Sequence, residues 1–373
     1  MRDRTLVTRA GLPEATPGAP FLPGPIFAGT YHTPGDPTNS PYTYGRFHNP
    51  TWTNYEAALS ALEGGPALAF SSGMAAITAI FGVVLRPGDL LVLPSDSYYT
   101  VRLLAQGYFT QMGIRVKTAP TARNEQKEII PGAKLLWLET PSTPVLDVCD
   151  IAELAALAHE AGTLVAVDNT TPSLLAQKPL QLGADFSIAS DTKALTGHSD
   201  LILGHIAVRD PALIEQLHTW RTQTGSVPGP MEVWLAHRSL GTLDVRLARQ
   251  SQNALEIANF LVSRSEVRSV RYPGLSEDPG YAIASRQMQY FGQVVSFTLA
   301  SREHAEAFLS ACQLVYEATS YGSLHTTAER RKRWGGDDVS EGFIRMSVGC
   351  EDVGDLIEDI ARALDISKKI NPS

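Results

Sequence analysis

The chain has 373 residues, of which 43% are hydrophobic and 19% are charged, so we expect a folded protein of two or three domains. Its formal charge of −8 argues against a nucleic-acid partner, because a general nucleic-acid binder carries an excess of basic residues. The three cysteines, Cys149, Cys312 and Cys350, are too widely spaced for a disulfide framework or a metal motif and favour a reducing compartment, the cytoplasm.

The N-terminal sequence has no apolar core of the kind found in signal peptides. The longest apolar stretch, residues 74–85, is interrupted by Thr78 and Gly82 and is shorter than the roughly 18 residues of a membrane span. We therefore expect neither secretion nor a membrane partner.

Residues 1–50 are expected to form an extended N-terminal arm. They contain 9 of the 24 prolines, which fix φ and lack a backbone donor. The arm also carries large apolar side chains that are poorly placed in water: Phe21, Ile26, Phe27, Tyr31, Tyr42, Tyr44 and Phe47. We therefore predict that the arm contacts a neighbouring subunit and is not a frayed terminus.

Short apolar runs alternate with helical stretches over residues 51–240. Six runs have the length of buried strands: Ala67–Phe70, Leu90–Leu93, Leu135–Leu138, Leu164–Val167, Phe186–Ala189 and His205–Val208. Between the third and fourth runs, Asp150 and Glu153 form a capping box at the start of an amphipathic helix. This alternation predicts an α/β domain with a mostly parallel sheet covered on both faces.

The pattern changes near residue 240, and residues 241–373 are predicted to form a smaller C-terminal α+β domain. Its expected helices are a long one over Leu243–Ser263, one near His304–Cys312 and a final one in which apolar residues recur from Val353 to Leu364. Its strand-like runs are Val267–Tyr272, Val294–Leu299 and Phe343–Val348.

Polar residues suited to a phosphate follow two of the expected strands. Open α/β sheets bind ligands beyond the carboxyl ends of their strands. Gly73 and Met74 open a helix whose unpaired N–H groups favour an anion, and Ser190 and Thr192 add hydroxyl donors. Taken alone, Ser-Gly before a helix is an ordinary cap.

Groups suited to a flat, aldehyde-bearing ring follow three of the expected strands. Lys193 follows a buried strand, where a desolvated amine of lowered pKa suits Schiff-base chemistry. Asp168 could keep a pyridinium nitrogen protonated, and Tyr98 could stack on the ring. A surface lysine, a turn acid and a core tyrosine are the ordinary alternatives. Together, these groups indicate a site for a planar, phosphorylated aldehyde.

The order of these motifs resembles the pyridoxal-phosphate (PLP) enzymes of Cys/Met metabolism. This family includes cystathionine γ-synthases, cystathionine β- and γ-lyases, methionine γ-lyases and O-acylhomoserine sulfhydrylases. The matching segments are Tyr44-Gly45-Arg46, Asn49-Pro50-Thr51, Ser72-Gly73-Met74-Ala75-Ala76, Glu139-Thr140-Pro141, Val167-Asp168-Asn169-Thr170, Ser190-Asp191-Thr192-Lys193, Gly197-His198-Ser199-Asp200, Tyr272-Pro273-Gly274-Leu275 and Arg345-Met346-Ser347-Val348-Gly349.

The resemblance implies the fold and the cofactor. The fold would be fold type I, like aspartate aminotransferase, with a mixed, mostly parallel seven-stranded sheet and a smaller C-terminal α+β domain. The assembly would be a homotetramer of two catalytic dimers. The implied PLP-binding residues are Lys193 (covalent bond), Asp168 (ring nitrogen), Tyr98 (ring stacking), Gly73, Met74, Ser190 and Thr192 (phosphate), and Tyr44 and Arg46 (phosphate of the neighbouring subunit).

The resemblance also implies the reaction. Lys193 would move the α-proton, Tyr98 would assist proton transfer to the leaving sulfur, and Asp168 would complete the catalytic set. The implied substrate contacts are Arg345 at the α-carboxylate, Ser320 and Thr143. We expect a carbon–sulfur lyase that converts L-cystathionine or L-methionine to 2-oxobutanoate, ammonia and a thiol. A γ-replacement enzyme (cystathionine γ-synthase or O-acylhomoserine sulfhydrylase) is the alternative, followed by cystathionine β-lyase.

The sequence departs from the family pattern at three positions. Thr143 stands where many members have Asn, Tyr99 where a glycine usually follows the stacking tyrosine, and His325 where many cystathionine enzymes have Glu. These departures leave the preferred sulfur amino acid open.

Two further features are interpreted as unrelated to the reaction. The charged run Glu329–Arg333 is expected to be a solvated loop, with the gating of an anionic substrate as the alternative. His198 and His205 lie near Lys193 in sequence, but no carboxylate or thiol completes a set at ligand spacing, so no metal is expected.

Overall fold

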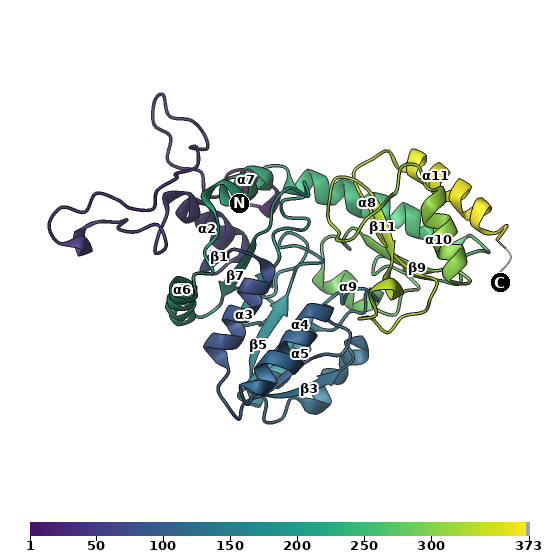
Figure 1. Ribbon diagram of the computed structural model, residues 1–373, viewed down its shortest axis with the longest axis horizontal. Helices are drawn as coiled ribbons and strands as arrows, with labels where there is room; N and C mark the ends of the chain where they lie inside the picture. The colour runs from purple at the N-terminus through teal and green to yellow at the C-terminus, as the bar shows by residue number, and fades with distance from the viewer. Residues whose placement is uncertain (371–373) are drawn as a thin grey trace.

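The computed structural model describes residues 1–370 and contains two β-sheets (Figure 1). The larger sheet has seven strands in the order β1-β7-β6-β5-β4-β2-β3. Its strands are β1 (Ala67–Phe70), β2 (Leu90–Pro94), β3 (Arg115–Ala119), β4 (Leu135–Glu139), β5 (Leu164–Asp168), β6 (Phe186–Ala189) and β7 (Gly204–Val208). All neighbouring pairs are parallel except those of β7, which is antiparallel to β1 and β6. The predicted mixed, mostly parallel seven-stranded sheet is therefore confirmed.

Helices cover both faces of the larger sheet, and the strands between them are almost entirely buried. The helices of this part are α2 (Pro50–Glu63), α3 (Gly73–Val84), α4 (Tyr99–Leu103), η2 (Leu104–Phe109), η3 (Ala122–Ile129), α5 (Ile151–Glu160), α6 (Ala212–Thr224) and α7 (Pro230–Leu240). The six predicted strands are confirmed. The edge strand β3 was not expected, because its exposed, partly charged side chains lack the apolar run of a buried strand.

The predicted capping box of α5 is only half formed. Asp150 caps the helix, since its Oδ1 accepts a hydrogen bond from the Glu153 N–H at 3.0 Å. The Glu153 carboxylate, however, accepts from Asn124 Nδ2 at 2.6 Å instead of returning to the backbone of Asp150. The side-chain oxygen of Asn124 accepts from the Asp150 N–H at 2.9 Å, so η3 supplies the bond that the capping box would have made.

The smaller sheet has five strands in the order β10-β11-β12-β9-β8. Its elements are β8 (Ser269–Arg271), β9 (Val294–Thr298), β10 (Tyr316–Glu317), β11 (Thr327–Arg330), β12 (Phe343–Ser347), η4 (Arg331–Trp334), α8 (Leu243–Val262), α9 (Tyr281–Gln287), α10 (Arg302–Ala311) and α11 (Val353–Ser367). Figure 1 shows α8, α10 and α11 gathered around this sheet, and their apolar side chains form one core with it. The expected helices and three of these strands are confirmed, and β10 and β11 were missed.

The N-terminal arm extends away from the larger sheet (Figure 1). It contains only the short helices α1 (Asp3–Leu6) and η1 (Pro37–Asn39). Phe21 is 89% exposed and Phe27 is 71% exposed, so most of the surface of these two rings is left uncovered by the described residues 1–370. Over residues 1–370, the structure has no helix of the length and apolar character that a membrane span needs.

Candidate active site

A cavity of about 340 Å³ lies at the carboxyl ends of β2, β4, β5 and β6, between the two sheets. It brings together ten of the residues singled out from the sequence: Gly73, Met74, Tyr98, Thr143, Asp168, Ser190, Thr192, Lys193, Ser320 and Arg345. The strands place the first eight, and the smaller sheet and its loops place the last two.

One end of the cavity is the N-terminus of α3. Ser72 Oγ caps the helix by accepting from the Ala75 N–H at 3.0 Å. A Cβ on Gly73 would lie 2.7 Å from the Ser190 side chain, so only glycine allows this close approach of helix and strand end. The first N–H groups of a helix have no intrahelical acceptor, and here they meet the cavity beside the Ser190 hydroxyl. This arrangement fits a phosphate.

Thr192 is also at this end, but its hydroxyl is largely engaged within the chain. Its Oγ1 donates to the Leu203 carbonyl at 3.1 Å and accepts from the Leu203 N–H at 3.0 Å. These bonds join the segment that leads into Lys193 to Leu203, the residue before β7, so the side chain of Thr192 shapes the cavity in addition to lining it.

Lys193 lies in the middle of the cavity wall, held by a loop from the smaller sheet. Its Nζ donates to Ser320 Oγ at 2.5 Å and lies 5.2 Å from the centre of the Tyr321 ring. Gly322, at φ 88°, presses this loop so closely on the chain after Lys193 that a Cβ would lie 2.4 Å from the Ala194 nitrogen. Burial and the nearby Arg345 guanidinium lower the pKa of the Lys193 amine to about 8. The neutral, nucleophilic amine is therefore accessible near neutral pH.

Two carboxylates, Asp168 and Glu139, form the acidic end of the cavity. They end the neighbouring strands β5 and β4 and are paired in register. Glu139 accepts from the backbone N–H groups of Tyr98 at 2.6 Å and Thr143 at 2.8 Å, while Asp168 accepts from Thr170 N–H at 3.0 Å. Burial raises the pKa of Asp168, and burial together with Asp168 raises that of Glu139. A cation placed against this pair would be stabilised by it.

Glu139 was missed as a site residue, although the Glu139-Thr140-Pro141 motif was recognised. Its position as the last residue of a buried strand, beside Asp168, is the signal that could have identified it.

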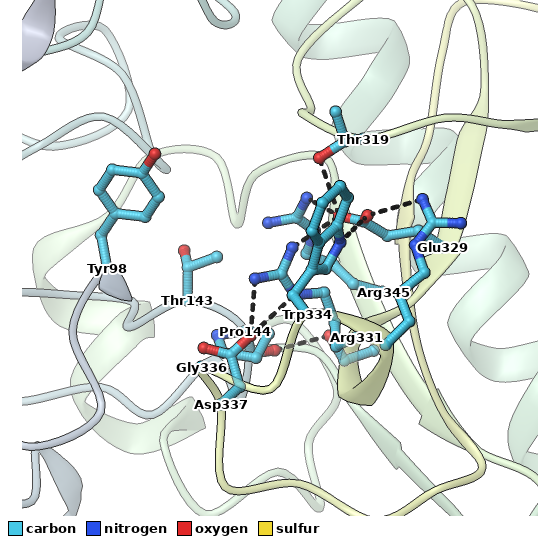
Figure 2. A network of polar contacts seen from close by, with 12 residues as sticks. Tyr98, Thr143, Pro144, Thr319, Glu329, Arg331, Trp334, Gly336, Asp337 and Arg345 are labelled. Atoms are coloured by element: carbon cyan, nitrogen blue, oxygen red, sulfur yellow. Dashed lines mark hydrogen bonds and ion pairs between the residues drawn. The ribbon is translucent and has the colours of Figure 1, made fainter. Parts of the chain in front are cut away.

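The arginine end of the cavity lies opposite, on the smaller sheet. Figure 2 shows Arg345, Arg331 and Glu329 gathered there, with Tyr98 and Thr143 on the other side of the view. Glu329 Oε1 accepts from Arg345 Nη2 at 2.5 Å and from Arg331 Nη1 at 2.7 Å. The expectation of a solvated loop at Glu329–Arg333 is wrong for its first residues, because Glu329 is only 1% exposed and Arg331 lines the cavity. Glu329 can be buried because the arginines around it compensate its negative charge.

Tyr98 and Tyr99 have different surroundings. Tyr98 lines the cavity, whereas Tyr99 packs against Gly336, and its ring lies 5.6 Å from the Arg102 guanidinium. Tyr98 is therefore the one of the two that can reach a ring bound near Lys193. The Thr143 hydroxyl is hydrogen-bonded to Thr171 Oγ1 at 3.1 Å, which fixes the orientation of the Thr143 side chain in the cavity wall.

Tyr44 and Arg46 do not reach this cavity within one chain. They line a separate cavity of about 400 Å³ with Phe27 and Trp52. Arg46 Nη1 donates to the Thr222 carbonyl at 2.7 Å, and its guanidinium lies 5.4 Å from the Tyr44 ring. Any contact of these two residues with the site requires a second chain.

His205 belongs to a buried ion cluster below the Lys193 segment. Its Nδ1 contacts Asp191 at 2.5 Å and its Nε2 contacts Glu63 at 3.0 Å, while Tyr55 donates to the other Asp191 oxygen at 2.8 Å. Although burial alone would lower it, the two carboxylates raise the pKa of His205 to about 10. The sequence did not predict this pairing of His205 with two carboxylates, because Asp191 and Glu63 are not at metal-ligand spacing from it. The two acids bind different ring nitrogens, and residues 1–370 contain no group of three or more His, Cys, Asp or Glu side chains that could hold a metal ion.

The donor set of the cavity fits PLP. The unpaired N–H groups at Gly73 suit its phosphate, the Lys193 amine suits its aldehyde, and the Asp168 carboxylate suits a protonated ring nitrogen. These groups line one continuous cavity, as a flat ligand with three such functions requires.

Comparison with known proteins agrees with this fit. The family model "Cys/Met metabolism PLP-dependent enzyme" matches residues 25–365. A putative cystathionine gamma-lyase from Streptomyces coelicolor is 54% identical over 97% of this chain and 93% of its own length. A cystathionine gamma-synthase from Mycobacterium tuberculosis is 38% identical over 87% of this chain and 86% of its own length. The crystal structure of a methionine gamma lyase from Micromonospora echinospora superposes with a TM-score of 0.92 and 36% identity, covering 98% of this chain and 99% of that one. The chain therefore belongs to the Cys/Met metabolism family of PLP-dependent enzymes.

Proposed function

We propose that the protein is a PLP-dependent carbon–sulfur lyase that catalyses γ-elimination of L-cystathionine or L-methionine to 2-oxobutanoate, ammonia and a thiol. The observation that carries this proposal is the position of Lys193, whose amine of lowered pKa lies between the acidic and arginine ends of one cavity. The gamma-lyase and methionine gamma lyase named among the similar proteins support the choice of reaction.

When bound, PLP supplies an electron sink that stabilises negative charge at the α-carbon of the substrate. Asp168 would hold the ring nitrogen protonated, while Gly73, Met74 and Ser190 would hold the phosphate and Thr192 would line that end of the cavity. These contacts orient the cofactor plane relative to the Lys193 amine.

The remaining residues act on the substrate. Arg345 binds the α-carboxylate, and Ser320 and Thr143 line the space beside it. The Lys193 amine takes the α-proton, since its pKa of about 8 keeps a useful fraction neutral at physiological pH. The Tyr98 ring stacks on the cofactor, and its hydroxyl gives a proton to the sulfur as it leaves the γ-carbon.

The proposal includes a shared site between two chains. Tyr44 and Arg46 of one chain bind the cofactor phosphate of the other, which gives the exposed aromatic arm a partner. Two such dimers form a homotetramer in the cytoplasm. We divide the chain into the arm (1–50), a PLP-binding domain (51–240) and a C-terminal domain (241–373).

Mixing two inactive variants tests the shared site. Arg46→Ala and Lys193→Ala subunits, unfolded and refolded together, should regain activity, because each mixed dimer has one site with both natural residues. Light scattering of the mixture should report a tetramer. Activity no higher than that of the separate variants would contradict the shared site.

A γ-replacement reaction is the second candidate, followed by cystathionine β-lyase. A cavity of about 850 Å³ adjoins the Lys193 cavity and shares Thr192, Ser320 and Tyr321 with it. This space could admit a thiol that adds to the γ-carbon, and the similar gamma-synthase supports that reading.

Product analysis separates these reactions. The PLP-loaded protein is incubated separately with L-cystathionine, L-methionine, and O-acetyl-L-homoserine plus a thiol. Rapid release of 2-oxobutanoate from either of the first two is the expected result, and Lys193→Ala should abolish it. Efficient thioether formation without 2-oxobutanoate would replace the lyase with the γ-replacement enzyme, and pyruvate from cystathionine would indicate the β-lyase.

A further inference from the structure

A second arginine, Arg331, reaches the cavity beside Arg345 and has no part in the reaction described so far. Arg331 begins η4 directly after β11, and Arg345 lies on β12, which pairs with β11. Glu329 on β11 stands opposite Arg345 in this register, and its Oε1 accepts from both arginines. One nitrogen of each guanidinium therefore lies within hydrogen-bonding distance of the same atom (Figure 2).

Both arginines keep donors for a ligand. Arg331 is fixed on its other side by Asp337, whose Oδ2 accepts from Nε at 2.9 Å and Nη2 at 2.6 Å. A guanidinium has five N–H donors in a rigid fork, so these bonds still leave N–H groups on the terminal nitrogens of Arg331. Arg345 Nη2 donates one hydrogen bond to Glu329 and another to the Ser320 carbonyl, the second at 3.1 Å. Within residues 1–370, its Nε and Nη1 make no hydrogen bond.

The charges of this cluster do not balance. Three guanidinium groups, Arg345, Arg331 and Arg102, have exposed side-chain fractions of 5%, 11% and 20%. They face two buried carboxylates, Glu329 and Asp337. Arg333 also reaches Glu329 but is matched by its own partner Glu317, so the cluster keeps one partly buried positive charge in excess, which an anion in the cavity would neutralise.

We propose that Arg331 and Arg345 together bind the α-carboxylate of the substrate amino acid, with Glu329 holding the two guanidinium groups from behind. This inference rests on the proposed function, since it takes Arg345 as the group that faces that carboxylate. The two oxygens of a carboxylate match two adjacent guanidinium donors. Without Arg331, the remaining two cations would be fully neutralised by Glu329 and Asp337, and the attraction for a substrate anion would fall.

Equilibrium binding of L-alanine and ethylamine to the PLP-loaded protein tests this role. Ethylamine is L-alanine without its carboxylate, and the binding of either amine is followed by the absorption of the cofactor. Arg331→Gln should weaken L-alanine binding by about tenfold or more and change ethylamine binding by less than about twofold. Arg331→Lys keeps the charge but not the paired donors of a guanidinium. It should weaken L-alanine binding by an intermediate amount and leave ethylamine binding unchanged.

Arg333→Gln is the matched control. Arg333 Nη2 also donates to Glu329, at 3.2 Å, but Arg333 does not line the cavity and is paired with Glu317. This variant should bind both amines as the unmodified protein does. Loss of L-alanine affinity equal to that of Arg331→Gln would mean that the Glu329 cluster, and not a contact with the carboxylate, is responsible, and would overturn the proposal.

The same substitution in an Arg345→Lys protein distinguishes a direct contact of Arg331 with the carboxylate from an indirect, structural role. If Arg331 touches the carboxylate, Arg331→Gln should weaken L-alanine binding further in an Arg345→Lys protein. No additional loss there, or an equal loss for both amines in the first experiment, would reject the proposal. Because binding of L-alanine requires no carbon–sulfur cleavage, a protein that passes these tests but releases no oxoacid rejects the proposed function and leaves this inference standing.

Discussion

The acidic end and the arginine end of the cavity shift the pKa values of their buried carboxylates in opposite directions. At the acidic end, Asp168 and Glu139 are buried side by side, their hydrogen-bond donors are neutral groups, and burial raises their pKa values. At the arginine end, Glu329 is as deeply buried, yet Arg345, Trp334 and Arg331 overcome the effect of burial and lower its pKa. A cationic ligand would neutralise the first end, whereas the second is already built from ion pairs within the protein.

This difference predicts opposite effects of pH on the protein without cofactor. A carboxylate with a raised pKa binds its proton more tightly in the folded state, so the acidic end loses stability as the pH rises above the ordinary carboxyl pKa of about 4. Glu329, with a lowered pKa, contributes stability above that value and loses it as the pH falls through its lowered pKa. Removing a carboxylate from the acidic end and removing one from the arginine end should therefore change the pH dependence of stability in opposite directions.

Among variants at the two ends of the cavity, Asp168→Asn should have the largest effect on activity. Loss of the carboxylate removes the anion that keeps the cofactor ring nitrogen protonated, so kcat should fall by about 100-fold or more. In contrast, the cofactor-free variant should be more stable than the unmodified protein near pH 7, because one of two adjacent buried acids is gone. Turnover assays and urea unfolding of the cofactor-free protein measure these quantities. Lower stability of the variant near pH 7 would contradict the view of Asp168 as an unneutralised buried charge.

Glu329→Gln should have its main effect on stability. It leaves the Arg345 and Arg331 guanidinium groups without their shared carboxylate, which should lower the free energy of unfolding by about 3 kcal/mol. The loss should shrink at acidic pH, where Glu329 is protonated in the unmodified protein as well. Urea unfolding at several pH values measures it. An equal loss at every pH would show that packing, and not charge, stabilises this residue.

Lys193, between the two ends, should control how fast the cofactor binds. Only the neutral amine attacks an aldehyde, and burial and Arg345 lower its pKa to about 8. The rate of PLP capture should therefore rise about tenfold per pH unit below pH 8 and level off above it. Stopped-flow absorption measures this rate, with pyridoxal-phosphate and free lysine as the reference. A midpoint near the ordinary lysine value would show that the amine is solvated.

Thr143→Val should have the smallest effect, because it removes one hydroxyl without removing a charge. Its Oγ1 is bonded to Thr171, and its backbone N–H, which Glu139 accepts, is unchanged. We expect KM for the amino acid to rise by about threefold or less. A loss of more than about tenfold would indicate a direct substrate contact through this hydroxyl.

The sequence predicted Asp168 at the acidic end but not Glu139, and at the arginine end it predicted Arg345 alone, for a physical reason. Asp168, Ser190 and Lys193 follow apolar runs that can only be buried strands, and parallel strands bring their carboxyl ends to one edge. Glu329 and Arg331 sit in a short charged run whose local pattern is that of a solvated surface. Glu329 is bound by Arg345, 16 residues away on the neighbouring strand, and Arg331 by Asp337, which also pairs with the distant Arg102; such pairing has no local periodicity. The same limit explains β3, an edge strand with polar side chains.

The ion cluster of His205, Asp191 and Glu63 has an evolutionary consequence. Asp191 lies two residues before Lys193, and it is anchored by Tyr55 on α2 and by His205 on β7. Replacement of His205 alone would leave two buried acids, Asp191 and Glu63, without their imidazolium, whereas replacement of Asp191 alone would leave His205 paired with Glu63. In related sequences, an apolar residue at 205 should therefore accompany neutral residues at both 191 and 63.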